Sequence, residues 1–241
     1  MIGKLRLGAL LLAPLAAGLC WYGWEVRGEA AGKAGEPERA EPAAALLAPM
    51  ELELDPAQSD LLRRLDQPVA AAFRKTPLQQ ALTTLGRQTG VQFILDADAL
   101  QEARIDGDEP VEARFEKTPL FRAVERILAP WGLSMCLSGE GVLITDSGTA
   151  RAQVWTRSYP VVDVAVVATD KRPQFLGREL VELIQDVVEP DSWDDMDGPC
   201  YVTFESLNFT VVATQSLRGH KEIERLLKML RAGRTQLEGL C

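Results

Sequence analysis

Apolar residues follow two different periods along the chain, and the change from one to the other predicts short strands and helices. Val69, Ala71 and Phe73 occupy alternate positions, which is typical of a strand with one buried face. From Leu78 the apolar positions recur every three or four residues, as on the buried side of a helix. A glycine ends this period, and the apolar run at 91–95 predicts a further strand. The pattern therefore predicts a strand–helix–strand unit.

This unit occurs twice. The segment that begins at Pro68 aligns without a gap with the segment that begins at Pro110, at an offset of 42 residues. Such a repeat indicates one supersecondary unit used twice. In the second copy Pro130 shortens the helix, and strands are expected at 133–137 and, after a turn, at 142–145. The identical pairs are Pro68/Pro110, Val69/Val111, Ala71/Ala113, Phe73/Phe115, Lys75/Lys117, Thr76/Thr118, Pro77/Pro119, Leu78/Leu120, Ala81/Ala123, Gly90/Gly132 and Leu95/Leu137.

Helix start and stop signals flank both repeated helices. We expect Thr76 to be the N-cap of the first helix, with Pro77 as the first helical residue and Gln79 completing a capping box. Gly90 and Gly132 follow the two helices, at the position where a left-handed residue commonly ends a helix. These signals set the expected bounds of both helices.

The order of these residues, doubled and followed by a terminal hairpin, resembles the STN domain (secretin and TonB-receptor N-terminal domain) over about residues 64–148. In that family the domain lies in the periplasm and docks onto other envelope proteins, so the resemblance implies protein recognition and not catalysis. The matching residues are Phe73, Thr76, Pro77, Leu78, Ala81, Leu82, Leu85, Gln88, Thr89, Gly90, Val91 and Phe93 in the first copy, and Lys117, Thr118, Pro119, Leu120, Ala123, Val124, Ile127, Leu128, Gly132 and Leu133 in the second.

A second α+β unit follows the repeat. Residues 154–162 predict a strand, and a helix is expected from about Gly177 to Pro190. Two strands are expected at 201–205 and 209–214. The residues expected on the buried face of the helix are Leu180, Leu183, Ile184, Val187 and Val188.

A last helix begins at about Arg218, and Gly233 is expected to end it. The resulting strand–helix–strand–strand–helix order resembles the ring-building N-domains of secretins over about residues 152–233. No pore-forming domain of a secretin follows, so we expect recognition modules without a channel. The resemblance rests on Tyr159, Pro160, Val161, Val162 and Asp163, on Leu183, Ile184, Val187, Asp191, Ser192 and Trp193, and on Val211, Val212, Thr214, His220, Ile223, Leu226, Leu227 and Leu230.

The sequence therefore predicts an α+β protein with two small open-sheet modules, a duplicated β-α-β unit and then a β-α-β-β-α unit, behind an N-terminal hydrophobic helix. The expected divisions are a signal peptide or transmembrane anchor at 1–26, an Ala/Glu/Pro linker at 27–62, an STN-like domain at 63–148, a secretin N-domain-like module at 152–233 and a tail at 234–241.

The N-terminal segment places the rest of the chain outside the cytoplasm. No charged residue occurs from Leu7 to Trp24, and Lys4 and Arg6 precede this run, which favours a cytoplasmic N-terminus. The segment is either a cleaved signal peptide or a retained anchor, and we favour the anchor because the run exceeds the usual apolar core of a signal peptide. The residues expected in the membrane include Leu10, Leu11, Leu12, Leu15, Trp21 and Trp24.

Composition excludes several function classes. The chain carries 26 Lys and Arg against 35 Asp and Glu, a net charge of −9, which argues against nucleic acid as a partner. It contains one histidine and no CxxC pair or phosphate-binding glycine motif, so we expect no enzyme activity, no cofactor and no metal. An acidic loop at 191–197 does not match the spacing of an EF-hand. We expect His220 at the surface or in a cap, and Cys136 and Cys200 as small buried residues.

These patterns predict a non-catalytic, extracytoplasmic protein-interaction protein of the cell envelope, tethered to the inner membrane or exported, that docks or assembles with a secretion or transport component. Small open sheets expose strand edges, which recruit another strand by backbone hydrogen bonding. The second module is a candidate for homo-oligomer formation. The alternatives are a metal-dependent envelope enzyme or sensor that uses the acidic loop, and a spacer that holds another protein away from the membrane.

Overall fold

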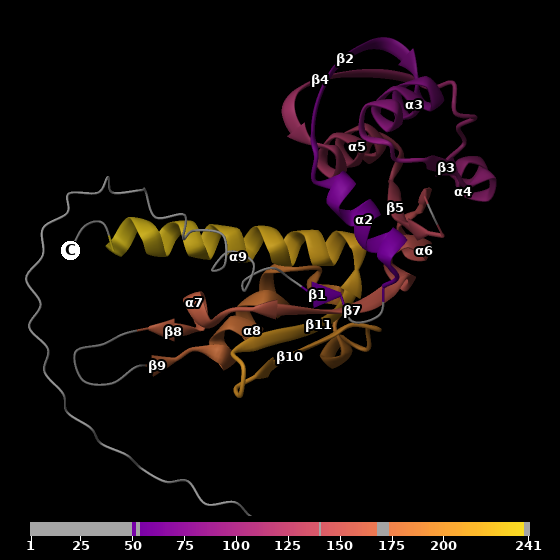
Figure 1. The fold of residues 1–241 in the computed structure, drawn as a ribbon. Helices are drawn as coiled ribbons and strands as arrows, with labels where there is room; N and C mark the ends of the chain where they lie inside the picture. Colours follow the sequence, from indigo (N-terminus) through magenta and orange to yellow (C-terminus); the bar gives the residue numbers. More distant parts are fainter. Residues whose placement is uncertain (1–49, 52–53, 140, 168–173, 239–241) are drawn as a thin grey trace, which may run out of the picture. The chain divides into compact units, whose positions relative to one another are not determined.

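The computed structural model describes residues 50–51, 54–139, 141–167 and 174–238, which belong to one compact unit (Figure 1). The predicted anchor, the tail residues 239–241 and the linker residues 27–49, 52 and 53 lie outside these residues. None of the helices in the described ranges is both long enough and apolar enough to cross a membrane. The fold is mixed α+β with small open sheets, which confirms that part of the predicted fold class.

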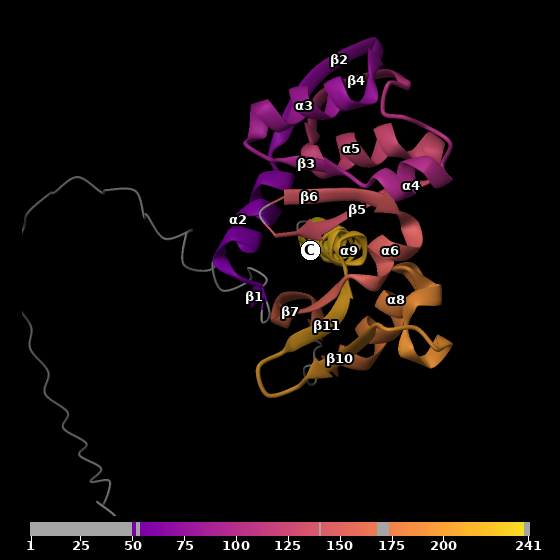
Figure 2. The ribbon, with the colours of Figure 1, turned by 90° about the vertical axis from the view of Figure 1, so that its right-hand side faces the viewer.

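The first module, residues 54–152, contains both copies of the repeat. Two helices from the repeat lie between a two-stranded sheet, β2–β4, and a three-stranded sheet with the order β3-β6-β5 (Figure 2). Its elements are α2 (Pro56–Leu65), β2 (Pro68–Pro77), α3 (Leu78–Thr89), β3 (Phe93–Leu95), α4 (Ala97–Glu102), β4 (Pro110–Pro119), α5 (Leu120–Leu128), a 3₁₀ turn (Ala129–Trp131), β5 (Leu133–Ser138), β6 (Gly141–Asp146) and α6 (Ser147–Ala152).

The sequence repeat is also an approximate twofold symmetry of the first module. Strands β2 and β4 pair antiparallel, so that the first residue of each lies opposite the last residue of the other. The hydrogen bond from Leu78 N to Glu109 O has an equivalent 42 residues away, from Leu120 N to Gln67 O, and both measure 2.9 Å. Each copy therefore supplies the backbone acceptor at the helix start of the other copy.

This exchange explains why the predicted helix caps are wrong. Thr76 and Pro77 belong to β2, and α3 begins one residue later without a side-chain cap. The first helical N–H groups instead donate to the backbone of the loop before β4, since Leu78 N bonds Glu109 O and Gln79 N bonds Gly107 O at 3.0 Å. Two of the first N–H groups of the helix are thus satisfied by backbone carbonyls and not by a cap side chain.

The glycines that follow the two helices are in the predicted left-handed conformation. Gly90 has φ +72° and Gly132 has φ +67°, a region that residues with a side chain avoid. The predicted α3 stripe is also buried: Leu78, Leu82 and Leu85 are at most 2% exposed. Local sequence signals thus fixed where these helices end and which side they bury.

The predicted linker extends too far into the folded part of the chain. Residues 56–62, assigned to the linker from composition, belong to helix α2, whose Leu61, Leu62 and Leu65 are buried in the first core. Asp55 caps this helix by accepting from Gln58 N at 2.8 Å, and Gln58 Oε1 accepts in turn from Asp55 N at 3.4 Å. The helix places these three leucines on one side, where burial in the core stabilises them. Composition, the basis of the linker assignment, does not show this spacing.

The second module, residues 154–238, has a sheet in the order β1-β7-β11-β10, in which β1 (Met50–Glu51) comes from the segment before the first module. Helices α8 and α9 pack with β7 and β11 into a second core (Figure 1). The remaining elements are β7 (Val154–Pro160), α7 (Val162–Ala165), the hairpin β8 (Val166–Val167) and β9 (Gln174–Phe175), α8 (Gly177–Val187), 3₁₀ turns at Pro190–Ser192 and Asp194–Met196, β10 (Tyr201–Glu205), β11 (Thr210–Ser216) and α9 (Leu217–Glu238).

Two details of the second module differ from expectation. Val187, predicted on the buried face of α8, is 53% exposed because it occupies the last residue of the helix, where the chain turns away. Gly233 does not end α9, which continues to Glu238. Arg231 and Arg234, on either side of this glycine, bond to the α7 region, with Arg231 Nε 2.6 Å from Asp163 Oδ2. These contacts hold the helix past the glycine.

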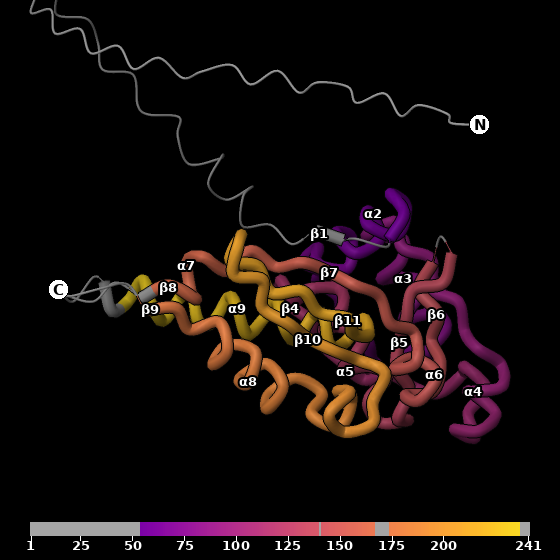
Figure 3. The backbone as a smooth tube through the Cα atoms, turned by 90° about the horizontal axis from the view of Figure 1, so that it is seen from below, coloured from indigo at the N-terminus to yellow at the C-terminus, as the bar shows by residue number. Residues whose placement is uncertain are grey.

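The two modules are joined by packing as well as by the chain. Trp155 of β7 and Leu217 of α9 lie in the hydrophobic core of the first module. Helix α9 runs beside β5 (Figure 2). Lys221 of α9, with a side chain only 5% exposed, bonds both carboxylate oxygens of Asp66 at 2.8 Å. The start of α9 therefore anchors the second module to the first (Figure 3).

Candidate functional site

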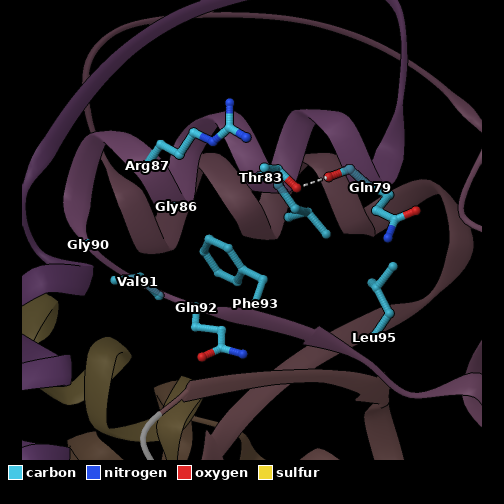
Figure 4. A pocket seen from close by; sticks show the side chains of 10 residues that line it. Gln79, Thr83, Gly86, Arg87, Gly90, Val91, Gln92, Phe93 and Leu95 are labelled. Carbon is cyan, nitrogen blue, oxygen red and sulfur yellow. Dashed lines mark hydrogen bonds between the residues drawn. The ribbon is translucent and has the colours of Figure 1, made fainter.

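A groove runs between helix α3 and strand β3 of the first module (Figure 4). It encloses about 530 Å³, within the range of ligand-binding clefts. Its floor is apolar, since Leu82 and Val91 are buried and Phe93 and Leu95 are half-buried. The residues that line it are Gln79, Leu82, Thr83, Gly86, Arg87, Gly90, Val91, Gln92, Phe93 and Leu95.

One wall of the groove is an open strand edge. β3 is the outermost strand of its sheet and pairs in parallel only with β6. Gln92 O accepts from Val142 N and Asp96 N donates to Ile144 O, both at 2.9 Å. Backbone groups alternate in direction along a strand, so the N–H and C=O groups of Phe93 and Leu95 face the open side. Within the described ranges, no strand pairs with β3 on this side.

Arg87 is the single charged residue in the lining of this groove. It lies on the exposed face of α3, and its side chain has no ion-pair or hydrogen-bond partner among the residues that the structure describes. The other polar rim residues, Gln79, Thr83 and Gln92, are neutral. The groove thus combines an apolar floor with an unpaired strand edge, and the Arg87 guanidinium points away from Phe93 and Leu95 (Figure 4).

The internal symmetry produces a second, equivalent groove between α5 and β5. Its lining includes Phe121, Glu125, Gly132 and Met135, which lie 42 residues after Gln79, Thr83, Gly90 and Phe93, and it encloses about 420 Å³. Elements outside the repeat border this groove. Ser147 donates to Gly132 O at 2.9 Å, and Arg218 of α9 approaches Glu125 with Nε to Oε1 at 3.7 Å. No described residue of the second module lines the α3–β3 groove.

The second module shows how its own sheet receives a strand. β1 pairs antiparallel with β7, with Met50 in register with Ser158 and Glu51 in register with Arg157. This two-residue strand lies within the predicted linker and covers part of the β7 edge. At the other end of the sheet, β11 is the one strand of the described residues that pairs with β10. The fold therefore contains one example of strand addition and further free edges.

His220 is fully buried, so the expected surface position is wrong. Its Nδ1 lies 2.7 Å from Tyr159 Oη, and its Nε2 lies 2.8 Å from Trp155 O. Because the carbonyl can only accept, Nε2 carries the proton and Nδ1 accepts from the tyrosine. Burial, followed by the positive charges of Arg157 and Lys221, lowers the pKa of His220 to about 3. The neutral ring ties β7 to α9 and has no route to a substrate.

The other buried charges compensate one another. Arg157 Nη1 lies 2.7 Å from Glu224 Oε1, and Lys221 Nζ lies 3.4 Å from Glu224 Oε2. Burial by itself would raise the pKa of Glu224, but the charges of Lys221 and Arg157 outweigh it and lower that pKa. This cluster keeps its charges paired next to the seam between the modules, as a structural network requires.

The acidic loop folds around a buried aromatic residue. Trp193 is 1% exposed and donates from Nε1 to Val188 O at 2.8 Å. Within the described ranges, which include this loop, no three His, Cys, Asp or Glu side chains are placed to hold a metal ion. Cys136 and Cys200 are buried as expected, and burial is the main cause that raises the pKa of both thiols.

The sequence patterns did not predict this groove. Strand edges were expected in general, but no pattern pointed to α3 and β3 in particular. The available signal was the difference between the two copies: Arg87 stands where the second copy has Ala129, and Gly86 stands where it has Leu128. Only the tertiary structure shows that these positions belong to the lining of a groove beside β3.

Comparison with known proteins gives low similarity throughout. No protein-family model matches the sequence, and no curated protein matches it. The solved structures that it resembles include secretins and secretin N-terminal domains. The N-terminal domain of the secretin XcpQ from Pseudomonas aeruginosa is 11% identical, with 68% of this chain and 65% of that chain covered and a TM-score of 0.24.

Two further secretin structures are similar at the same level. The GspC–GspD complex from the type II secretion system of enterotoxigenic Escherichia coli is 13% identical, with 68% of this chain and 99% of that chain covered and a TM-score of 0.25. The type IV competence pilus secretin PilQ of V. cholerae is 9% identical, with 67% and 38% covered and a TM-score of 0.26. The chain covers about 65% of the length of two of the XcpQ chains that it matches.

Proposed function

We propose that this chain is a non-catalytic docking protein of the cell envelope that binds a secretion or transport component by accepting one of its strands. The observation that carries the proposal is the open edge of β3, which faces a groove with an apolar floor. Strand addition of this kind supplies affinity through main-chain hydrogen bonds and specificity through the side chains beside the edge. Both requirements are met between α3 and β3.

The pairing of β1 with β7 supports this mode of binding. There, an extended segment from outside the module pairs with the edge of a sheet. The chain therefore already contains a sheet edge to which a strand has been added. The buried ionisable groups, among them His220 and Glu224, are paired in structural contacts, which leaves the groove as the feature best suited to function.

We place the folded part on the extracytoplasmic side of the inner membrane, tethered or exported. The support for this location is the uncharged N-terminal run with its basic flank, together with the resemblance of the sequence to STN and secretin N-domains. The same resemblance suggests an STN-like first module and homo-oligomer formation through the second module. Light scattering on the detergent-solubilised chain tests the oligomer, and a monomer at high concentration would contradict it.

The groove can be blocked by one substitution that has a close control. Thr83 and Thr84 are adjacent, exposed residues of α3, and each donates its hydroxyl to the carbonyl four residues earlier. Thr83 lines the groove, whereas Thr84 does not. A tryptophan at position 83 therefore fills the groove, while a tryptophan at 84 changes the helix surface beside it.

The test is a cross-linking pull-down from solubilised envelope with the full-length chain, Thr83→Trp and Thr84→Trp. We expect a secretion or transport component to be recovered with the unaltered chain and with Thr84→Trp, and to be lost with Thr83→Trp. Urea unfolding establishes that both variants are folded. Equal recovery with all three proteins would refute docking at the groove.

A further inference from the structure

We infer that one end of the second module rests on the surface of a lipid bilayer through an apolar tip, which consists of Phe175, Leu207 and Phe209. This inference rests on the proposed tethering of the chain to the inner membrane. It does not depend on the partner that the α3–β3 groove binds, because no residue of the apolar tip lines that groove.

The apolar tip joins two hairpins. Leu207 lies in the turn 206–209 between β10 and β11 and is 95% exposed, and Phe175 of β9 is 57% exposed. The rings of Phe175 and Phe209 stack with their centroids 5.5 Å apart. Phe209 has φ +52°, a conformation that bulky residues rarely adopt. Exposed apolar side chains gathered at one point of a surface indicate a contact with an apolar phase or partner.

Backbone contacts place the C-terminal end of α9 beside the apolar tip. Val166 of β8 pairs with Phe175, and Val166 O accepts from Arg234 Nη1 of α9 at 2.6 Å. Val161 N, before α7, donates to Phe209 O at 2.8 Å. The hairpin β8–β9 and the last turns of α9 accordingly lie together in Figures 1 and 3. The apolar tip and the end of α9 thus belong to one end of the module.

The direction of β1 argues for a bilayer as the occupant. β1 is antiparallel to β7, with Met50 in register with Ser158, so the chain enters β1 from the side of Pro160. Pro160 is in register with Thr210, the residue that follows the turn 206–209. The predicted anchor therefore leads into the folded part at the end where the apolar tip lies. A flexible chain of the length of segment 27–49 spans roughly 25–30 Å, which keeps this end near the membrane.

The end of α9 adds charge of the sign that anionic lipids attract. From position 225 to position 237 the chain has four basic residues and no acidic one, although its net charge is −9. Asp163, the acid that contacts this segment, is paired with Arg231 at 2.6 Å. Glu205 is exposed at the end of β10 beside the turn, and a carboxylate is costly in hydrocarbon. The contact is therefore at the level of the lipid headgroups.

The experiment uses the full-length chain in vesicles of phosphatidylethanolamine and phosphatidylglycerol, with photo-reactive benzoylphenylalanine in place of Leu207 or, as the control, of Met196. Met196 is also exposed, but it precedes β10 and so lies at the opposite end of that strand from Leu207. Trypsin releases both positions in the same peptide, because no lysine or arginine occurs between Arg178 and Arg218. After illumination, we expect lipid attached to this peptide from position 207 and little from position 196.

Phe175→Asp, combined with the photo-reactive residue at 207, tests the apolar contact. It should lower the lipid adduct by about 3- to 12-fold, the ratio that corresponds to burial of half a phenylalanine side chain. Val187→Asp is the matched control, because Val187 is similarly exposed and ends the helix α8 that begins next to Phe175. This control should leave the adduct unchanged, and urea unfolding establishes that both variants are folded.

Equal lipid adducts at positions 207 and 196, or an adduct at 207 that Phe175→Asp leaves unchanged, would overturn the inference. A protein–protein adduct at 207 in place of the lipid adduct would show a second copy as the occupant and would also overturn it. Failure of the chain to float with the vesicles would overturn the tethering and the inference with it. Docking at the α3–β3 groove is measured separately by the pull-down with Thr83→Trp, so it can stand when the apolar tip fails.

Discussion

Replacement of His220, the single histidine of the chain, by glutamine removes the group that links folding to pH in the mildly acidic range. The neutral ring donates from Nε2 to Trp155 O and accepts at Nδ1 from Tyr159 Oη. Arg157 and Lys221 lie close enough to disfavour a positive charge on it. Glutamine also supplies one donor and one acceptor but does not titrate.

The size and the sign of the effect follow from the two pKa values. The pKa of His220 is about 3 in the folded protein and about 6.5 in the unfolded chain, so the unfolded state binds more protons as the pH falls below about 6.5. Stability is therefore complete above that pH and decreases below it, by about 1.4 kcal/mol for each unit. Between pH of about 7.5 and 5 the loss is about 2 kcal/mol.

Above pH 5, the change of stability with pH reports this histidine and not the carboxylates. Asp60, Asp96 and Asp146 have lowered pKa values through hydrogen bonds that they accept, so their stabilising effect is lost only at lower pH. Urea unfolding of the full-length chain and of His220→Gln, at several pH values between about 5 and 7.5, measures the difference. The unaltered chain should lose about 2 kcal/mol over this interval and the variant much less. Equal losses in both proteins would refute the buried, neutral histidine.

The remaining predictions concern two glycines and the seam between the modules. A Cβ atom at Gly86 would lie 2.4 Å from Val91 O, so Gly86→Ala should destabilise the protein by about 1–3 kcal/mol. A Cβ atom at Gly233, an exposed residue of α9, would meet no neighbouring atom within 4 Å, so Gly233→Ala should stabilise the protein by about 0.5–1 kcal/mol. Urea midpoints measure both, and equal effects of the two substitutions would contradict the close approach of α3 to Val91. Leu217→Ala should cost about 2–5 kcal/mol, because Leu217 is fully buried in the first core although it begins α9. Hydrogen exchange should then show lost protection in α5 and β5 as well as in α9, and a loss confined to α9 would mean that the seam does not couple the modules.

The sequence predicted most elements of both modules because their signals are local. The αL glycines at 90 and 132 depend on a backbone conformation that glycine alone adopts freely, and the leucines of α3 depend on the helical period. The 42-residue repeat also predicted a duplicated unit, and the pairing of β2 with β4 shows how the two copies meet. Each of these features is specified by residues close together in the chain.

Features that depend on distant residues were not predictable in this way. Thr76 lost its expected capping role because a carbonyl of Glu109 from the other copy reaches the helix start first. His220 became a core residue because β7 brings Trp155 and Tyr159 to both of its ring nitrogens. Sequence spacing cannot show which backbone group from another element will arrive within hydrogen-bonding distance.

Local patterns in the sequence predicted the strand and helix order of both modules. They also predicted the left-handed glycines that follow the repeated helices, because periodicity and glycine conformation act over a few residues. The tertiary structure decided which strand edges stay open, which charges remain unpaired and where the modules join. The two copies of the repeat illustrate the division: the α5–β5 groove is bordered by Arg218 and the α3–β3 groove is not, although both arise from one repeated pattern. Burial and pairing depend on neighbours in space, and the repeat alone does not contain those neighbours.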